Sequence, residues 1–154
     1  MTYKPGRHIY LAAGFFSDPQ RELCSYIERK EGTWAPIYSP RIDGGVLKPD
    51  DKSEVIKEVF DSNKLAVQTS RFVLAIIDDY DPGVIWEMGY AHGKGIRTLG
   101  YSDVEGRGLN VMLAGSCNLG FINGRDSLDG FFRGMERFPG MDPFPYNTWS
   151  GEIQ

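Results

Sequence analysis

Apolar positions along the chain gather into short, nearly continuous runs. The runs lie at residues 8–14, 33–41, 71–78, 96–102 and about 118–122. A run such as 71–78 (RFVLAIID) is typical of a strand whose two faces are both covered by helices. We therefore predict five strands. We place residues 33–41 (TWAPIYSPR) at the edge of the sheet, because Pro36 has no N–H to donate to a neighbouring strand.

Apolar residues at helical spacing separate these runs. The first predicted helix runs from its N-cap, Asp18, to Gly32. The second covers residues 52–69, the third follows Asp81, and the last two cover residues 109–115 and 126–136. The second of them carries its apolar residues on one face, namely Val55, Ile56, Val59 and Phe60. Strands that alternate with helices imply a parallel α/β sheet with right-handed crossovers. We expect a single domain over residues 1–154 because a chain of this length is too short for two.

Composition narrows the class of protein. Hydrophobic residues make up 41% of the 154 residues, charged residues 25%, and the net charge is −4. Such a surface, without a basic stripe, does not suit a nucleic-acid backbone. No run approaches the roughly 18 apolar residues of a membrane span, and no signal peptide is apparent. The isolated Cys24 and Cys117 fit a reducing compartment, so we expect a cytoplasmic protein.

Three loops follow the carboxyl ends of predicted strands, where open parallel sheets bind ligands. They are Gly14–Ser17, Pro40–Lys48 and Asp78–Gly83. The third loop is rich in acids, and its last acid, Asp81, is placed to cap the helix that starts at Pro82. That structural role does not exclude a second one.

A single carboxylate, Glu87, lies inside the helix that follows this loop. Gly83 and Ala91 stack above and below it on the same helix face and leave space over the carboxylate. A void beside a charge indicates a ligand site. From the pattern alone, Glu87 could also be a solvated residue or an ion-pair partner of Lys94 or Arg97.

The remaining patterns favour glycosyl chemistry. The first loop (AAGFFS) lacks the glycines of a phosphate-binding loop, and no serine or cysteine lies in a nucleophile elbow. His8 and His92 have no ligand spacing, so we expect neither a metal nor a cofactor. Two carboxylates beside aromatic residues remain. One carboxylate can attack an anomeric carbon, while a second acid handles the proton of the leaving group.

Three motifs, in this order and spacing, resemble the nucleoside 2-deoxyribosyltransferases. They are IYLAAGFF (9–16), DPGVIWEMGYAHGKG (81–95) and GLNVML (108–113). The most specific part is an acid six residues before Glu-Met-Gly-Tyr-Ala. The resemblance implies a flavodoxin-like, doubly wound α/β sandwich around a central five-stranded parallel sheet. It also implies exchange of a 2-deoxyribosyl group between free purine or pyrimidine bases.

The resemblance assigns three catalytic residues. Glu87 matches the nucleophile, which attacks C1′ of a 2′-deoxynucleoside and holds the sugar as a covalent ester, so that the exchange proceeds by double displacement with retention. Asp81 matches the acid that contacts the base and passes a proton to it. Tyr10 matches the tyrosine whose hydroxyl holds the nucleophile in position.

Further residues match substrate contacts. Phe15 and Phe16 match the wall of the base site. Asn110 matches an asparagine that reaches the 5′-hydroxyl of the sugar bound in an adjacent subunit. That contact implies a homo-oligomer built from dimers, commonly a hexamer. The other contacts that we expect are Gly14, Gly83, Asn63, Arg41 and Asp43. The last two lie in a segment, residues 38–45, that would cover the base; they could equally be solvated loop residues.

Several alternatives stay open at this level. Asn63 stands where many members of the family carry an aspartate, so the sequence leaves the base preference undecided. A hydrolase of the same fold would cleave the N-glycosidic bond with water, but the first loop offers Ser17 and no basic residue before Arg21 to bind a 5′-phosphate. A non-catalytic nucleoside-binding domain is the third reading. The chain end (WSGEIQ) resembles a segment that folds back toward the active site.

Overall fold

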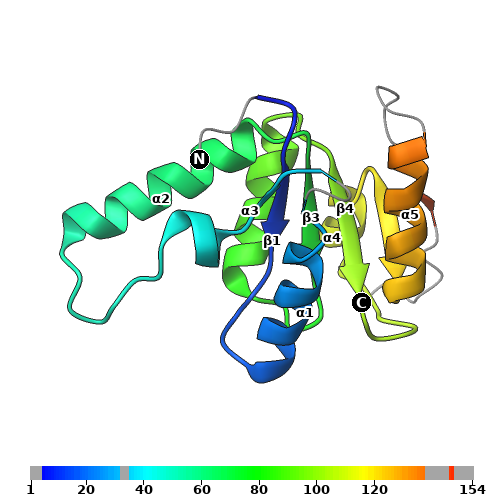
Figure 1. Cartoon of the computed structure of the whole chain (residues 1–154), viewed down its shortest axis with the longest axis horizontal. Helices are drawn as coiled ribbons and strands as arrows, with labels where there is room; N and C mark the ends of the chain where they lie inside the picture. Colours follow the sequence, from blue (N-terminus) through cyan, green and yellow to red (C-terminus); the bar gives the residue numbers. More distant parts are fainter. Residues whose placement is uncertain (1–4, 32–34, 138–145, 148–154) are drawn as a thin grey trace.

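A computed structural model describes residues 5–31, 35–137 and 146–147 of the chain (Figure 1). All strands run parallel in one sheet with the order β2-β1-β3-β4-β5-β6. Their bounds are β1 Ile9–Ala12, β2 Ile37–Tyr38, β3 Phe72–Ile76, β4 Thr98–Ser102, β5 Gly120–Asn123 and β6 Tyr146–Asn147. The five predicted strands are confirmed, each shorter than its apolar run, and β2 lies at the sheet edge as predicted. β6 adds a two-residue strand that the sequence analysis did not predict.

Helices cover both faces of this sheet. Their bounds are α1 Asp18–Glu28, α2 Ser53–Gln68, α3 Pro82–Gly93, α4 Val111–Ser116 and α5 Arg125–Arg137, with a short π-type turn, η1, at Pro40–Gly44. One apolar core joins the sheet to α1 and α5. A second core joins the opposite face to α2, α3 and α4. The doubly wound α/β sandwich predicted from the sequence is therefore confirmed.

The first helix begins one residue earlier than predicted. Ser17, not Asp18, is its N-cap, and Ser17 and Gln20 form a reciprocal capping box. The helix ends at Glu28, with Arg29 as C-cap. The predicted terminator, Gly32, lies outside the described residues, as do the chain end and Gln154.

The apolar stripe predicted on the second helix does not pack on the sheet. Val55, Ile56 and Phe60 are 39%, 48% and 47% exposed, and α2 buries only Ala66 and Val67 near its end. Figure 1 shows the reason, since the first half of α2 projects beyond the edge of the sheet. Sequence periodicity detects an apolar face but does not say what covers it.

The strand order places the site. Chain progression reverses between β1 and β3, which are neighbours in the sheet, so the loops after these strands diverge to opposite faces and leave a crevice at their carboxyl ends. Glu87 and Asp81 both lie close after β3, at this crevice. No helix in the described ranges is long and apolar enough to cross a membrane.

Candidate active site

Loops from the carboxyl ends of β1, β2 and β3 enclose a cavity of about 410 Å³. Phe15 and Phe16 line it after β1, Val46 and Leu47 after β2, and Asp81 and Gly83 after β3. The three loops singled out in the sequence are thus brought together as predicted. The volume lies in the range of small-molecule sites.

Glu87, in the second turn of α3, lines this cavity and is half-buried. Burial raises the pKa of Glu87 to about 7, a hydrogen bond from Tyr10 opposes this rise, and the negative charge of Asp81 adds to it. Among the described residues, the hydrogen-bond partner of Glu87 is Tyr10. The alternative of an ion pair with Lys94 or Arg97 is therefore not what the structure contains. Near neutral pH the carboxyl is poised between its charged and neutral forms.

Tyr10 holds this carboxyl from the sheet. Its side chain is fully buried, and its hydroxyl donates to Glu87 Oε1 at 2.5 Å. Burial, and then the charge of Glu87, raise the pKa of Tyr10 far above its usual value. The phenol thus keeps its proton and fixes one carboxylate oxygen, which leaves the other oxygen of Glu87 for the cavity.

Asp81 has a structural role and a free oxygen. Its Oδ1 accepts hydrogen bonds from the backbone N–H groups of Gly83, at 2.9 Å, and Val84, at 3.1 Å. The predicted N-cap of α3 is therefore confirmed. The side chain also lines the cavity, and its Oδ2 makes no hydrogen bond within the described part of the chain. One oxygen can hold the helix while the other contacts a ligand.

A second opening, of about 230 Å³, reaches Glu87 from between α2 and α3. Phe60 from α2 and Trp86 from α3 line it, with their rings edge to face at 5.4 Å. Gly83, which stacks one helical turn before Glu87, borders both this opening and the larger cavity. The space that the sequence predicted above the carboxylate is therefore present.

Gln20 fixes the aromatic loop after β1. The rings of Phe15 and Phe16 stack at 4.8 Å, and Gln20 Oε1 accepts from the backbone N–H groups of Phe16, at 2.7 Å, and Ser17, at 2.9 Å. Its Nε2 donates to Asp79 Oδ2 at 2.8 Å, which ties this loop to the one after β3. The sequence analysis missed Gln20, although Ser-x-x-Gln before a helix is a recognisable capping-box pattern.

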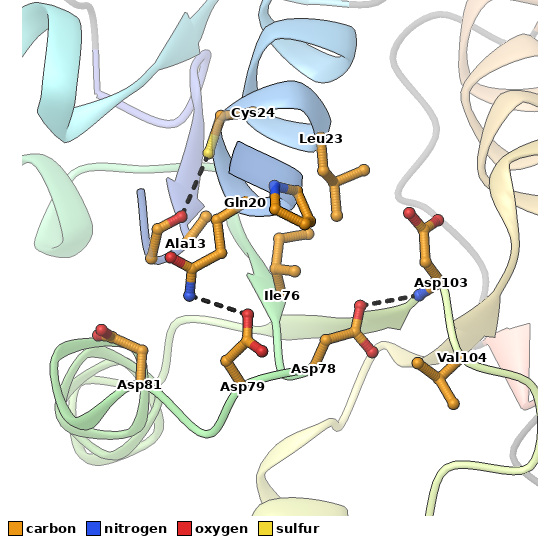
Figure 2. Close-up of a pocket in the computed structure, with 12 residues that line it drawn as sticks. Ala13, Gln20, Leu23, Cys24, Ile76, Asp78, Asp79, Asp81, Asp103 and Val104 are labelled. Carbon is orange, nitrogen blue, oxygen red and sulfur yellow. Dashed lines mark hydrogen bonds between the residues drawn. The ribbon is translucent and has the colours of Figure 1, made fainter. Parts of the chain in front are cut away.

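A third cavity, of about 220 Å³, lies on the α1 side of Asp81 (Figure 2). Asp78 and Asp79 stand beside Asp81 along it, and Figure 2 shows the hydrogen bond between Asp78 and the backbone N–H of Asp103, 2.9 Å long. Asp78 also accepts from the hydroxyl of Ser102. In the portion of the chain described, no group of three or more His, Cys, Asp or Glu residues could hold a metal ion. Through its two hydrogen bonds, Asp78 joins the loop after β3 to the end of β4.

Three predicted contacts lie away from Glu87. The carbonyl of Gly14 accepts from Cys24 Sγ at 3.5 Å, and Gly14 lines the α1-side cavity. The guanidinium of Arg41 pairs with the Glu28 carboxylate, its Nε lying 2.7 Å from Oε1. Asp43 accepts from the backbone N–H of Ser39 at 2.8 Å. Arg41 and Asp43 line neither space at Glu87, so the structure favours their role as loop residues.

The two predicted asparagines lie in different places. Asn63, on α2, lines both spaces that reach Glu87. Asn110 is exposed at the N-cap of α4, where its side chain accepts from the backbone N–H of Met112 at 2.8 Å, and it lines neither space.

Comparisons with solved structures agree with this fold. The 2-deoxyribosyltransferase from Bacillus psychrosaccharolyticus superposes with a TM-score of 0.71 at 24% identity, over 90% of this chain and 98% of that one. A conserved protein from Enterococcus faecalis V583 gives a TM-score of 0.51 at 20% identity, over 96% of this chain and 90% of that one. At these sequence identities, both matches show a shared fold. A search of curated proteins gave no match.

The sequence itself matches a family profile. The profile of the family described as Nucleoside 2-deoxyribosyltransferase aligns with residues 9–118, more than two thirds of the chain. This range includes Asp81 and Glu87, which line the larger cavity, and Tyr10, which donates a hydrogen bond to Glu87. The chain therefore belongs to the nucleoside 2-deoxyribosyltransferase family.

Proposed function

We propose that this protein transfers a 2-deoxyribosyl group between nucleobases by double displacement at Glu87, with a covalent glycosyl intermediate and overall retention. One observation carries the proposal. A carboxylate held by a buried phenol faces a ligand-sized cavity that also contains a second acid, at the carboxyl edge of a parallel sheet. Membership of the family supports the class of reaction.

In the first displacement, the free oxygen of Glu87 attacks C1′, the C1′–N bond to the base breaks, and an ester to the sugar forms. Positive charge develops on the sugar ring, and the negative charge of Glu87 stabilises it. Asp81 transfers a proton to the departing base through the oxygen that does not cap α3. In the second displacement a nitrogen of a new base attacks C1′ from the face that the first base left, and the C1′–O ester bond to Glu87 breaks. The proton of that nitrogen passes to Asp81, and the original configuration at C1′ is restored.

Tyr10 has a positioning role in this mechanism. Its short hydrogen bond fixes the orientation of the Glu87 carboxyl and favours its charged form, the form that attacks. Without that bond, burial would hold more of the carboxyl neutral at pH 7.

Free nucleosides suit the site better than 5′-nucleotides. The basic residue nearest the first loop, Arg21, is engaged by the Asp18 carboxylate and donates to the carbonyl of Phe15 at 3.2 Å. A 5′-phosphate at this loop would compete with those contacts for the guanidinium.

We propose further that the protein is a homo-oligomer in which Asn110 of one subunit completes the site of its neighbour. Exposed apolar side chains on the three helices of one face support this: Val55, Ile56, Phe60, Leu65, Ile85, Trp86, Val111 and Met112. Exposed apolar side chains gathered on one face of a protein are typical of an interface. Asn110, at the N-terminus of α4, belongs to the same layer of helices.

The reaction is tested by chromatography of thymidine incubated with hypoxanthine and the purified protein. We expect deoxyinosine and thymine to form together. Free deoxyribose with thymine would instead identify a hydrolase. If thymidine does not react, deoxyinosine with guanine separates a purine-specific transferase, which forms deoxyguanosine, from a binding domain, which forms nothing. Glu87→Ala serves as the inactive control, with a rate at least about a thousandfold lower.

The intermediate and the assembly have tests of their own. Mixing the protein with deoxyinosine alone should add the mass of one deoxyribosyl group to the peptide that contains Glu87; no such adduct would exclude the covalent route. For the oligomer, Glu87→Ala and Asn110→Ala variants are co-refolded. A mixed oligomer with one intact site regains activity only if Asn110 is supplied by a neighbour, so no recovery would contradict the shared site.

A further inference from the structure

Two tyrosines occupy paired positions on neighbouring strands beside the larger cavity. Tyr10 on β1 and Tyr38 on β2 are register partners, so both side chains leave the sheet on the same face. Their rings stack with centroids 5.5 Å apart and planes 13° from parallel. Both are buried, which fixes the two hydroxyls relative to each other.

The two hydroxyls bind different partners. Tyr10 donates to Glu87, and Tyr38 donates to Asn63 Oδ1 at 3.0 Å. Both partners line the two spaces that reach the carboxylate. One tyrosine thus positions the nucleophile, and its stacking partner positions an amide in the same space.

The oxygen of the Asn63 amide is occupied by contacts within the protein. Burial raises the pKa of Tyr38 to about 12, so the phenol remains a donor at neutral pH and occupies Oδ1. Gly44 packs behind that oxygen, because a Cβ added to Gly44 would lie 2.3 Å from Oδ1 but 3.3 Å from Nδ2. Nδ2 makes no hydrogen bond to any other described residue. The two N–H groups of the amide are thereby left for the cavity.

Asn63 differs from the other described residues of the larger cavity in its hydrogen-bonding groups. Among the described residues that line the larger cavity, Asn63 is the only one whose side chain carries N–H groups; the others are apolar, glycine, proline or the two acids Asp81 and Glu87. Purine bases differ in the group that they present at position 6. Hypoxanthine and guanine carry an oxygen that accepts a hydrogen bond, whereas adenine carries an amino group that donates.

We propose, building on the proposed function, that Tyr38 fixes Asn63 as a hydrogen-bond donor to the base and that the site therefore selects 6-oxopurines over adenine. Asn63 is then a specificity residue and Tyr38 a positioning residue that acts through it. Placing the amide N–H groups against the amino group of adenine leaves two donors opposed and unpaired, which costs affinity.

The test compares kcat/KM for deoxyinosine and deoxyadenosine as donors, with guanine as the common acceptor. We expect about a five- to tenfold preference for deoxyinosine, the value of one hydrogen bond. In Asn63→Asp a carboxylate oxygen accepts from the amino group, so the preference should invert. In Tyr38→Phe the amide is free to turn, and the preference should fall toward one while kcat for deoxyinosine changes less. Asp61→Asn, on the same helix but paired with Lys57 outside both spaces, is the matched control and should keep the wild-type ratio.

Calorimetric binding of hypoxanthine and adenine, without any sugar donor, separates the two proposals. If no transfer or hydrolysis occurs but hypoxanthine binds more tightly, the proposed function fails and the selection by Asn63 stands. Transfer with equal or reversed donor preference in the wild type overturns the selection, as does an unchanged ratio in Asn63→Asp. A full preference in Tyr38→Phe overturns the positioning role of Tyr38.

Discussion

The two faces of the sheet share the same strands but differ in what they bury. On the α1 and α5 face, Phe72, Phe131 and Phe132 form an aromatic cluster with centroids 5.4–6.4 Å apart. At its surface this face is closed by a hydrogen bond from Tyr26 to Asp129, 2.7 Å long. On the α2, α3 and α4 face, the buried tyrosines direct hydroxyls out of the core to Glu87 and Asn63, and a cavity remains.

Strand β1 shows how one segment supplies both faces. Ile9 and Leu11 pack in the α1 and α5 core, while Tyr10 and Ala12 belong to the opposite core. Because side chains alternate along a strand, four consecutive residues can serve stability on one side and chemistry on the other. The aromatic cluster of the first face is closely packed, whereas the second face gives up packing around Glu87 for a site.

The largest expected effect tests the closely packed cluster of the first face. Phe132→Ala removes a fully buried ring from the aromatic cluster and should lower the free energy of unfolding by about 3–5 kcal/mol. Phe60→Ala is the matched change on the other face, where the ring is 47% exposed, and should cost the monomer about 1–2 kcal/mol. Denaturant titrations of both variants measure the difference. Equal losses would break the contrast between the faces.

A smaller change in the free energy of unfolding, in the stabilising direction, tests how much stability the buried Glu87 charge costs. The pKa of Glu87 is raised from 4.5 to about 7 in the folded protein. The folded state therefore binds the proton more tightly, and wild-type stability falls as pH rises through this window. Glu87→Gln carries no such charge, so at pH 8 it should be more stable than wild type by about 3 kcal/mol. The gain should vanish near pH 4; a gain that persists there would have another cause.

The smallest expected effect concerns the hydrogen bond between Tyr10 in the sheet and Glu87. Under the proposed mechanism the charged form of Glu87 attacks, so kcat/KM should rise with pH around a midpoint near 7. Tyr10→Phe removes the hydrogen bond that lowers the pKa of Glu87, so the midpoint should move up by about one pH unit. The pH profiles of wild type and variant measure this shift. An unchanged midpoint would mean that Tyr10 does not act on the Glu87 charge.

The sequence predicted the parts of the fold and site that depend on local pattern. The five strands are encoded in apolar runs, the cap of α3 in Asp81-Pro82, and the space over Glu87 in the small residue one turn before it. These features need only neighbours within one or two helical turns.

What depends on distant partners was not predictable from one sequence. Tyr38 and Asn63 are 25 residues apart, and only the register of β2 against β1 shows that the tyrosine faces α2. The apolar stripe of α2 was found by its periodicity but lies largely outside the core, since periodicity does not identify the covering surface. β6 is only two residues long and follows a proline-rich segment, which gives no alternating pattern to detect.

The short length of β2 means that Tyr10 and Tyr38 are held in the sheet under different structural constraints. Tyr10 stands on a strand paired on both sides, so the Glu87 carboxyl is anchored by the most constrained part of the sheet. Tyr38 stands on a two-residue edge strand, where a slip by one position would turn its side chain to the opposite face. Under the proposed function, insertions or substitutions at this edge would therefore change which bases are accepted and leave the bond-breaking step intact. Related proteins could therefore differ in base selectivity at this edge and keep the same catalytic residues.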